Sequence, residues 1–179
     1  MNVFLLAAGR GRRAGGPKAL LEDGGVTALE RQLRFLAGLT PPERVSVSIQ
    51  EAWLPGLRSR SPLTRWVCVD PDLSPLASLQ ALLRERPDAE DGFLYHVDMP
   101  VFEPRVFDTL ARAPKDGGEA WVPAFNGRRG HPALLSRALY PEILRLDPGR
   151  DRLDAFLRSR RVAEVPVAWP CVLENRNAG

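Results

Sequence analysis

The chain has 179 residues, 44% hydrophobic and 26% charged, a composition that predicts one soluble domain spanning residues 1–179 with a substantial core. Its net charge of +3 and pI near 9.3 suit small anionic substrates. No basic block with interleaved aromatic residues indicates nucleic acid binding, and no apolar run is long enough for a membrane span. With no signal peptide before the first expected strand, we expect a cytoplasmic protein.

The opening stretch, residues 1–18, is an apolar run that ends at Gly9 and continues as glycines interleaved with arginines. This pattern predicts a buried strand that delivers a loop to a sheet edge, where backbone N–H groups and basic side chains meet a polyphosphate. It is not a Walker A loop, because Pro17 separates Gly16 from Lys18. It also lacks the third glycine of a dinucleotide-binding loop, where Ala14 stands. A solvated turn is the alternative.

The rest of the chain alternates expected helices and strands. Thr27 followed by Glu30 has the spacing of a capping box and predicts a helix start. Pro55 and Gly56 are expected to limit residues 52–60 to one broken helical turn. Further helices are expected over 27–39, from the 73–79 segment through 86, and over 103–113 and 151–160. Strands are expected over 44–50, 66–69, 92–97, 121–125, 133–135 and 162–168.

Three kinds of side chain in this pattern call for a local interpretation. Cys68 and Cys171 lie in apolar contexts without metal-like spacing, so we expect buried thiols and no disulfide. His96 lies inside an expected strand and is interpreted as a hydrogen-bonded core or sheet-face histidine. Asp98 ends that strand where open α/β sheets place ligands, and its carboxylate suits Mg²⁺. Asp98 followed by Met99 and Pro100 is also compatible with a plain turn.

The opening residues LAAGRGRRAGGPK resemble the start of the nucleotidyltransferases related to the molybdenum cofactor cytidylyl- and guanylyltransferases. Sugar-phosphate nucleotidyltransferases begin with a similar motif. Ala14 departs from the family, which usually has methionine there. The resemblance implies a three-layer α/β/α Rossmann-like fold of the nucleotide-diphospho-sugar transferase type, with a mostly parallel sheet and a small antiparallel hairpin. It also implies that Asp98-Met99-Pro100 matches the family's Asp-x-Pro motif, whose aspartate holds the catalytic metal.

The resemblance carries roles to particular residues. Arg13, Lys18 and Asp98 are expected to be catalytic, with Arg13 and Lys18 stabilising charge on the leaving pyrophosphate. Ser74 and Ser78 begin a helix in the segment that the family places beside the nucleobase, and a plain helix start is the alternative. The residues expected to bind the nucleotide are Leu6, Ala7, Ala8, Gly9, Gly11, Arg13, Lys18, Ser74 and Ser78.

The second half of the chain contains a Gly-Arg-Arg-Gly-His-Pro run that resembles the family's Gly-x-x-Gly-His-Pro hairpin. Gly130, His131 and Pro132 are therefore expected to contact the acceptor, and a structural hairpin with exposed arginines is the alternative. At the C-terminal end the resemblance weakens. Glu174 or Asn175 is a candidate for the second metal ligand beside Asp98, because each offers an oxygen, but a frayed tail fits the residues as well.

These features together predict a Mg²⁺-dependent nucleotidyltransferase that moves a nucleoside monophosphate from CTP or GTP to a phosphorylated acceptor such as molybdopterin. The base and the acceptor stay open. A sugar-phosphate nucleotidyltransferase is one alternative, although the chain lacks room for the substrate insertions of those enzymes. A nucleotide-binding regulator without catalytic activity is another, suggested by the unusual C-terminal end. A Rossmann dehydrogenase is disfavoured by the missing third glycine.

Overall fold

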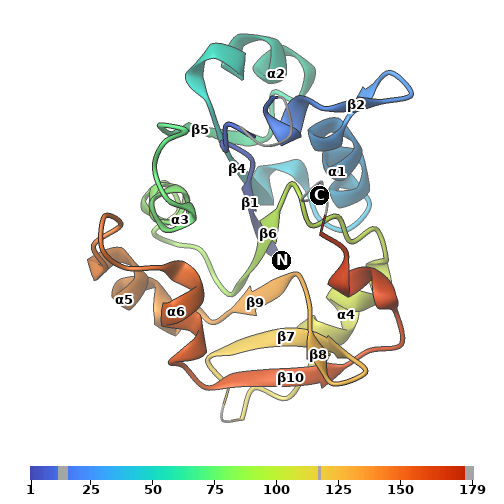
Figure 1. Cartoon of the computed structure of the whole chain (residues 1–179), viewed down its shortest axis with the longest axis vertical. Coiled ribbons are helices and arrows are strands. Elements are labelled where there is room, and N and C mark those ends of the chain that lie inside the picture. Colours follow the sequence, from blue (N-terminus) through green and yellow to red (C-terminus); the bar gives the residue numbers. More distant parts are fainter. Residues whose placement is uncertain (12–15, 117, 176–179) are drawn as a thin grey trace.

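The computed structural model describes residues 1–11, 16–116 and 118–175, and its centre is one mostly parallel sheet (Figure 1). The strands follow the order β10-β7-β9-β6-β1-β4-β5, and β8 pairs with β7 beside this path. A separate two-stranded hairpin, β2 and β3, lies outside the sheet. The strands are β1 (Asn2–Leu6), β2 (Glu22–Asp23), β3 (Val26–Thr27), β4 (Val45–Ile49), β5 (Arg65–Cys68), β6 (Gly92–His96), β7 (Ala120–Phe125), β8 (Arg128–Arg129), β9 (Ala133–Leu135) and β10 (Val162–Pro166).

Strand direction divides the sheet into two parts. β5, β4, β1 and β6 run parallel to one another, and β1 and β6 pair from Asn2↔Gly92 to Leu6↔His96. β9 is antiparallel to both of its neighbours, β6 and β7, whereas β10 is parallel to β7. The carboxyl ends of β1 and β6 therefore meet at one edge, which is where ligands bind in open α/β sheets.

Helices cover both faces of the sheet. The α-helices are α1 (Ala28–Ala37), α2 (Leu54–Arg60), α3 (Pro75–Arg84), α4 (Pro104–Arg112), α5 (Tyr140–Arg145) and α6 (Leu153–Arg158). Figure 1 shows α3, α5 and α6 on one side of the sheet and α1 and α4 on the other. This arrangement confirms the expected three-layer architecture with a mostly parallel sheet and a small antiparallel hairpin.

Two buried clusters hold these layers together, because successive strand residues point to opposite faces. Val3, Leu5 and Phe93 pack with the helices on the α1 and α4 side. Phe4 and Leu94 point the other way, into the cluster formed with α3, α5 and α6. None of these five side chains is more than 4% exposed. The strands that carry the predicted site residues are thus fixed by packing on both faces.

Several local predictions are confirmed by the structure and two are corrected. The capping box at Thr27 is present: Glu30 N–H donates to the Thr27 hydroxyl, and Thr27 N–H donates to the Glu30 carboxylate. α2 is not a single broken turn, because Pro55 lies in its first turn, where the missing N–H costs nothing, and the helix runs on through Gly56. Cys68 is exposed at the end of an edge strand rather than buried, and Cys171 is only partly buried; both cysteines are free. His96 is described with the site below.

Across the residues that the model describes, no helix combines the length and the hydropathy needed to span a membrane.

Candidate active site

The exit of β1 into the opening loop is fixed by hydrogen bonds to the neighbouring strand. Ala7 N–H donates to the backbone oxygen of Ser48 at 3.1 Å, and Gln50 Nε2 donates to the Ala8 oxygen at 2.9 Å. Both alanines are almost fully buried. The N–H of Ala7 is therefore occupied, and the contribution of Ala7 and Ala8 in this structure is to aim the loop that follows them.

Gly9 and Gly11 have different environments within the loop. Gly11 has φ +60°, and a Cβ there would lie 1.9 Å from the backbone oxygen of Gly16, so the loop needs glycine for its own closure. A Cβ on Gly9 would meet none of the described residues within 4 Å. The described part of the loop therefore does not require glycine at position 9. Arg13 and Ala14 lie outside the described residues.

Arg10 forms an ion pair with Asp72, which lies in the connection between β5 and α3. The two side chains are 47% and 48% exposed, so water screens this attraction and its contribution to stability is small. The pair nevertheless ties the opening loop to the loop that precedes the predicted Ser74–Ser78 segment.

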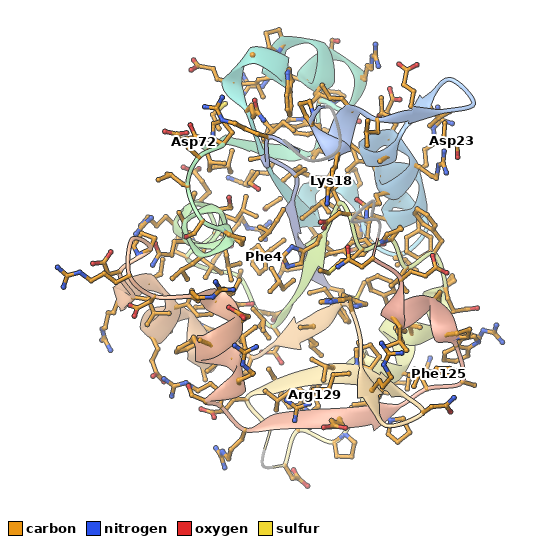
Figure 2. All side chains as sticks on the ribbon, in the orientation of Figure 1. Phe4, Lys18, Asp23, Asp72, Phe125 and Arg129 are labelled. Atoms are coloured by element: carbon orange, nitrogen blue, oxygen red, sulfur yellow. The ribbon has the colours of Figure 1, made fainter. Side chains whose placement is uncertain are left out.

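The predicted catalytic residues Lys18 and Asp98 come together although 79 residues separate them in the sequence. Lys18 Nζ lies 3.1 Å from Asp98 Oδ2. The side chains are 19% and 22% exposed, so the pair is largely sheltered but can be reached by a ligand. Figure 2 shows Lys18 near the centre of the molecule, above the ring of Phe4 in β1. The structure thus joins the end of the loop to the end of β6.

The turn that carries Asp98 is anchored from two sides. Val97 N–H donates to the Leu6 oxygen at 3.1 Å, which extends the β1–β6 pairing by one residue. The buried Tyr95 hydroxyl donates to the Val101 oxygen at 3.0 Å and accepts from the Val101 N–H at 2.8 Å. Asp98 is therefore held between two fixed points. Burial also raises the pKa of Tyr95, which stays a neutral donor.

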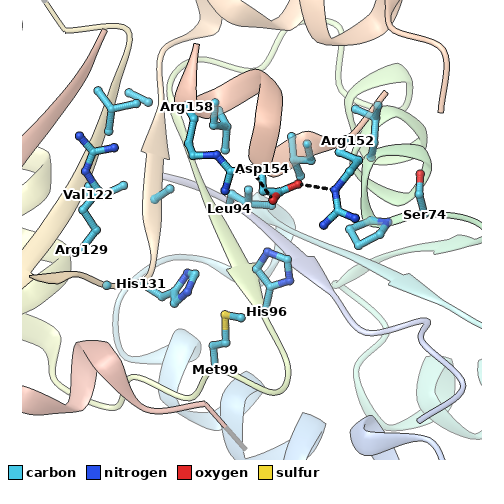
Figure 3. Close-up of a pocket in the computed structure, with 18 of the residues that line it drawn as sticks. Ser74, Leu94, His96, Met99, Val122, Arg129, His131, Arg152, Asp154 and Arg158 are labelled. Carbon is cyan, nitrogen blue, oxygen red and sulfur yellow. Dashed lines mark hydrogen bonds and ion pairs between the residues drawn. The ribbon is translucent and has the colours of Figure 1, made fainter. Parts of the chain in front are cut away.

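A cavity of about 560 Å³ opens beside Asp98, on the α3 and α6 side of the sheet (Figure 3). His96 and His131 both line it, with ring centroids 6.0 Å apart and ring planes inclined at 66°. Burial lowers the pKa of His96 to about 4, helped by the nearby His131 and opposed by the Asp98 carboxylate. Burial also lowers the pKa of His131. Both rings are therefore neutral at pH 7. His96 therefore lies on a face of the sheet, one of the two expected alternatives, but its ring lines a cavity and makes no hydrogen bond with the described residues.

The hairpin that carries His131 is pinned by the end of the chain. His131 N–H donates to the Val172 oxygen at 2.8 Å, and the peptide bond to Pro132 is cis. A Cβ on Gly130 would lie 2.4 Å from that same Val172 oxygen, so only glycine allows this approach. Gly130 N–H is itself bonded to the Pro123 oxygen at 2.7 Å.

Glu174 and Asn175 follow directly after the 3-10 helix Pro170–Leu173, which carries Val172. Both are exposed. The contact between Val172 and His131 brings this end of the chain to the same hairpin that lines the cavity.

Ser74 is the N-cap of α3, and Ser78 lies in the first turn of that helix. The Ser74 hydroxyl accepts from Ala77 N–H at 3.4 Å as the helix N-cap and donates to the Pro148 oxygen at 3.1 Å. Ser78 is 7% exposed. Ser74 lines the same cavity as His131, so a residue expected near the nucleobase shares a cavity with one expected near the acceptor.

Three arginines line the cavity as well, and each is paired. Arg152 Nε lies 3.1 Å from Asp154 Oδ1, and Arg158 reaches Asp154 Oδ2 at 2.9 Å. Arg129 Nε lies 2.8 Å from the carboxylate of Glu164. Figure 3 shows Asp154, with Arg152 and Arg158 beside it, across the cavity from the two histidines and Met99. These carboxylates hold the guanidinium groups in place.

Sequence reasoning did not identify the role of Tyr95 or the place of His96 in a cavity. Tyr95 looks like any apolar strand residue, and its partner Val101 lies beyond the Asp98 turn. A signal did exist for His96: it has the same strand parity as Leu94, and both face the cavity. That signal needs the pairing of β6 with β9, which sequence alone does not supply.

Comparison with known proteins places this geometry in a family. The family model of the MobA-like NTP transferase domain matches residues 3–165. A comparison with curated proteins found no match to this sequence.

Three solved structures show the same fold. Rv0371c from Mycobacterium tuberculosis H37Rv is 26% identical, with 93% of this chain and 88% of that one covered and a TM-score of 0.73. A structure of Rv0371c in complex with manganese superposes at 22% identity over 93% and 87% of the two chains, with a TM-score of 0.66. Molybdopterin-guanine dinucleotide biosynthesis protein A from Archaeoglobus fulgidus is 22% identical over 93% and 84%, with a TM-score of 0.68.

The family match spans the opening loop, the Asp98 turn and the Gly-His-Pro hairpin, which are the parts that the fold gathers around one sheet edge. The chain belongs to the MobA-like NTP transferase family and is a nucleotidyltransferase.

Proposed function

We propose that this nucleotidyltransferase moves a nucleoside monophosphate from CTP or GTP to a phosphorylated acceptor of the molybdopterin type. An oxygen of the acceptor's phosphate attacks the α-phosphorus, the bond between the α- and β-phosphates breaks, and pyrophosphate leaves. The observation that carries the proposal is the 3.1 Å pair of Lys18 and Asp98, next to a cavity large enough for an acceptor. Such a reaction depends on positioning and charge neutralisation, not on a covalent nucleophile.

The opening loop would hold the triphosphate. Gly9 leaves open space in which a phosphate can approach the backbone. Lys18, and Arg13 from the part of the loop outside the described residues, would stabilise the charge that develops on the leaving pyrophosphate. Lys18 is paired with Asp98 in this structure, so it would turn from the carboxylate to the phosphates when the nucleotide enters.

Asp98 would hold Mg²⁺, and its carboxylate is the kind of oxygen ligand that this cation prefers. Among the described residues no group of three or more His, Cys, Asp or Glu side chains is gathered for a metal ion, so the protein would supply few ligands. Mg²⁺ commonly binds in this way, through one or two carboxylates, substrate phosphates and water. When bound, the ion would neutralise phosphate charge. Glu174 and Asn175 remain candidates for a second ligand, since their segment reaches the hairpin beside Asp98.

The acceptor would lie in the cavity of about 560 Å³, with Gly130 and His131 in its wall; Pro132, the third residue expected to contact the acceptor, follows them in the hairpin but does not line the cavity. The apolar part of its lining would suit the ring system of a molybdopterin-type acceptor. The cavity's apolar side chains are Pro75, Leu76, Leu94, Ala120, Val122, Ala133, Leu153, Leu157 and Val162.

Pyrophosphate release tests the proposal. The purified protein would be incubated with Mg²⁺ and either CTP or GTP, with molybdopterin or glucose 1-phosphate as the acceptor. We expect release with molybdopterin and with one of the two nucleotides. Release with glucose 1-phosphate alone would assign the enzyme to sugar-phosphate activation, and no release with either acceptor would reject the proposed reaction.

A further inference from the structure

His96 and His131 are brought face to face by strand register. β6 and β9 are antiparallel, with Leu94 opposite Ala133. Two residues further along that register His96 stands opposite His131, and all four residues line the cavity. These are the only histidines in the chain of 179 residues. The fold therefore directs the whole histidine content of the protein to one wall of one cavity (Figure 3).

The backbone around both rings is fixed, whereas the ring nitrogens are not engaged. The His96 carbonyl accepts from Gln32 Nε2 at 3.0 Å and from Met99 N–H at 3.2 Å. His131 N–H donates to the Val172 oxygen. Within the described residues neither imidazole makes a hydrogen bond with the protein. Each ring thus presents nitrogens that can hydrogen-bond a ligand.

The other polar side chains of the cavity already have protein partners. Arg152 and Arg158 bind Asp154, Arg129 binds Glu164, and Ser74 caps α3. Asp151 accepts the N–H of Asp147 at 2.8 Å. Of the cavity's polar side chains, the two imidazoles alone have no hydrogen-bonding partner within the described part of the chain. A ligand that enters would meet them as its available neutral hydrogen-bonding groups.

We propose that His96 is an acceptor-binding residue and that it forms, together with His131, hydrogen bonds to the polar groups at one edge of the acceptor. The inference rests on the proposed function and deepens it. Asp98 lies two residues after His96, so the part of the acceptor bound by the rings lies next to the carboxylate assigned to the cation. The acceptor class that fits is a phosphorylated molecule with a flat or apolar body and a few hydrogen-bonding groups at one edge.

Nuclear magnetic resonance offers a direct test, because a protein with two histidines gives two imidazole Cε1–H signals. His96→Gln and His131→Gln assign them by removing one signal each. Molybdopterin would be added to the wild-type protein, and a non-hydrolysable CTP or GTP analogue would be added to a second sample. We expect molybdopterin to shift both signals by more than the nucleotide analogue does. A shift of the His131 signal alone would overturn the role of His96.

Steady-state kinetics distinguishes a role of His96 in binding the acceptor from a purely structural role. His96→Leu keeps the volume and removes the hydrogen bonds, whereas His96→Gln keeps a donor and an acceptor. We expect His96→Leu to raise the acceptor KM by roughly 10-fold or more and His96→Gln to recover part of that loss. The nucleotide KM should change less than about twofold in both variants. Leu63→Gln, at an exposed position far from the cavity, is the matched control.

The outcomes distinguish the inference from the proposed function. An unchanged acceptor KM in a folded, active His96→Leu protein would reject the inference and leave the proposed function standing. Thermal melting shows whether that variant is folded, and His96→Gln provides the second variant if it is not. If the wild-type protein releases no pyrophosphate with any acceptor, the proposed function fails and the inference fails with it.

Discussion

The two sides of Asp98 are built in different ways. On one side, Lys18 comes from the opening loop and meets Asp98 as a charged pair with both side chains about one-fifth exposed. On the other side, His96 at the end of β6 and His131 just before β9 meet as neutral rings in the wall of a mostly apolar cavity. The first side uses charge and suits phosphates, which all nucleotides share. The second uses shape and a few hydrogen bonds, which differ between acceptors.

The largest expected effect lies on the charged side. Asp98→Ala should lower turnover by roughly 100-fold or more, because a cation ligand typically contributes several kcal/mol to the transition state. Lys18→Ala should also lose most turnover, and it should raise Mn²⁺ affinity in the absence of nucleotide by freeing Asp98 from its ion pair. Pyrophosphate release and Mn²⁺ titration measure the two effects. Full activity of either folded variant would remove that residue from the mechanism.

Substitutions at two glycines of the loop test two different properties: closure of the loop at Gly11 and contact with the nucleotide at Gly9. Gly11→Ala should weaken nucleotide binding by roughly 10-fold or more, because its Cβ would clash with the Gly16 oxygen at a positive φ. A Cβ on residue 9 would meet no atom of the described residues, so we expect any loss of affinity in Gly9→Ala to come from a close approach of the phosphates. Calorimetry with CTP and GTP measures both. Unchanged binding in both variants would remove the loop from the nucleotide site.

The acceptor side depends on one close backbone contact. Gly130→Ala should lower the free energy of unfolding by about 1–3 kcal/mol, because its Cβ would lie 2.4 Å from the Val172 oxygen and push the C-terminal segment off the hairpin. The matched control is Gly56→Ala, which has open space inside α2 and should stabilise by about 0.5–1 kcal/mol. Urea unfolding compares them. Equal stability of the two variants would contradict the packing described here.

The smallest expected effect is the dependence of stability on pH through His96. Its folded pKa of about 4 lies below the unfolded value of 6.5, so the unfolded chain binds a proton first as the pH falls. The contribution of neutral His96 to the free energy of unfolding is fully present above pH 6.5 and is lost as the pH falls from 6.5 to 4. At pH 5 the loss is about 1–2 kcal/mol. His131 adds to this trend and the Asp98 carboxylate opposes it. Urea unfolding of His96→Leu at pH 7.5 and pH 5 should show a smaller loss than the wild-type protein.

Local sequence patterns sufficed for the elements whose causes are local. The capping box of Thr27 and Glu30 and the apolar run of β1 are short-range features, and the structure confirms both. The exposure of Cys68 was not predictable in this way, because it depends on β5 being an edge strand. α2 is longer than the sequence pattern indicates, because Pro55 lies in its first turn, where proline does not interrupt a helix.

The sequence by itself determined the charged side of the site: the loop residues and the Asp-x-Pro turn are contiguous motifs, and their chemistry can be recognised from residue types. Only the tertiary structure decided the other side. His96 faces His131 because β6 pairs with β9 in one register, and that register is set by packing between residues about 40 positions apart. The meeting of Lys18 with Asp98 has the same origin, since both follow adjacent parallel strands to one sheet edge.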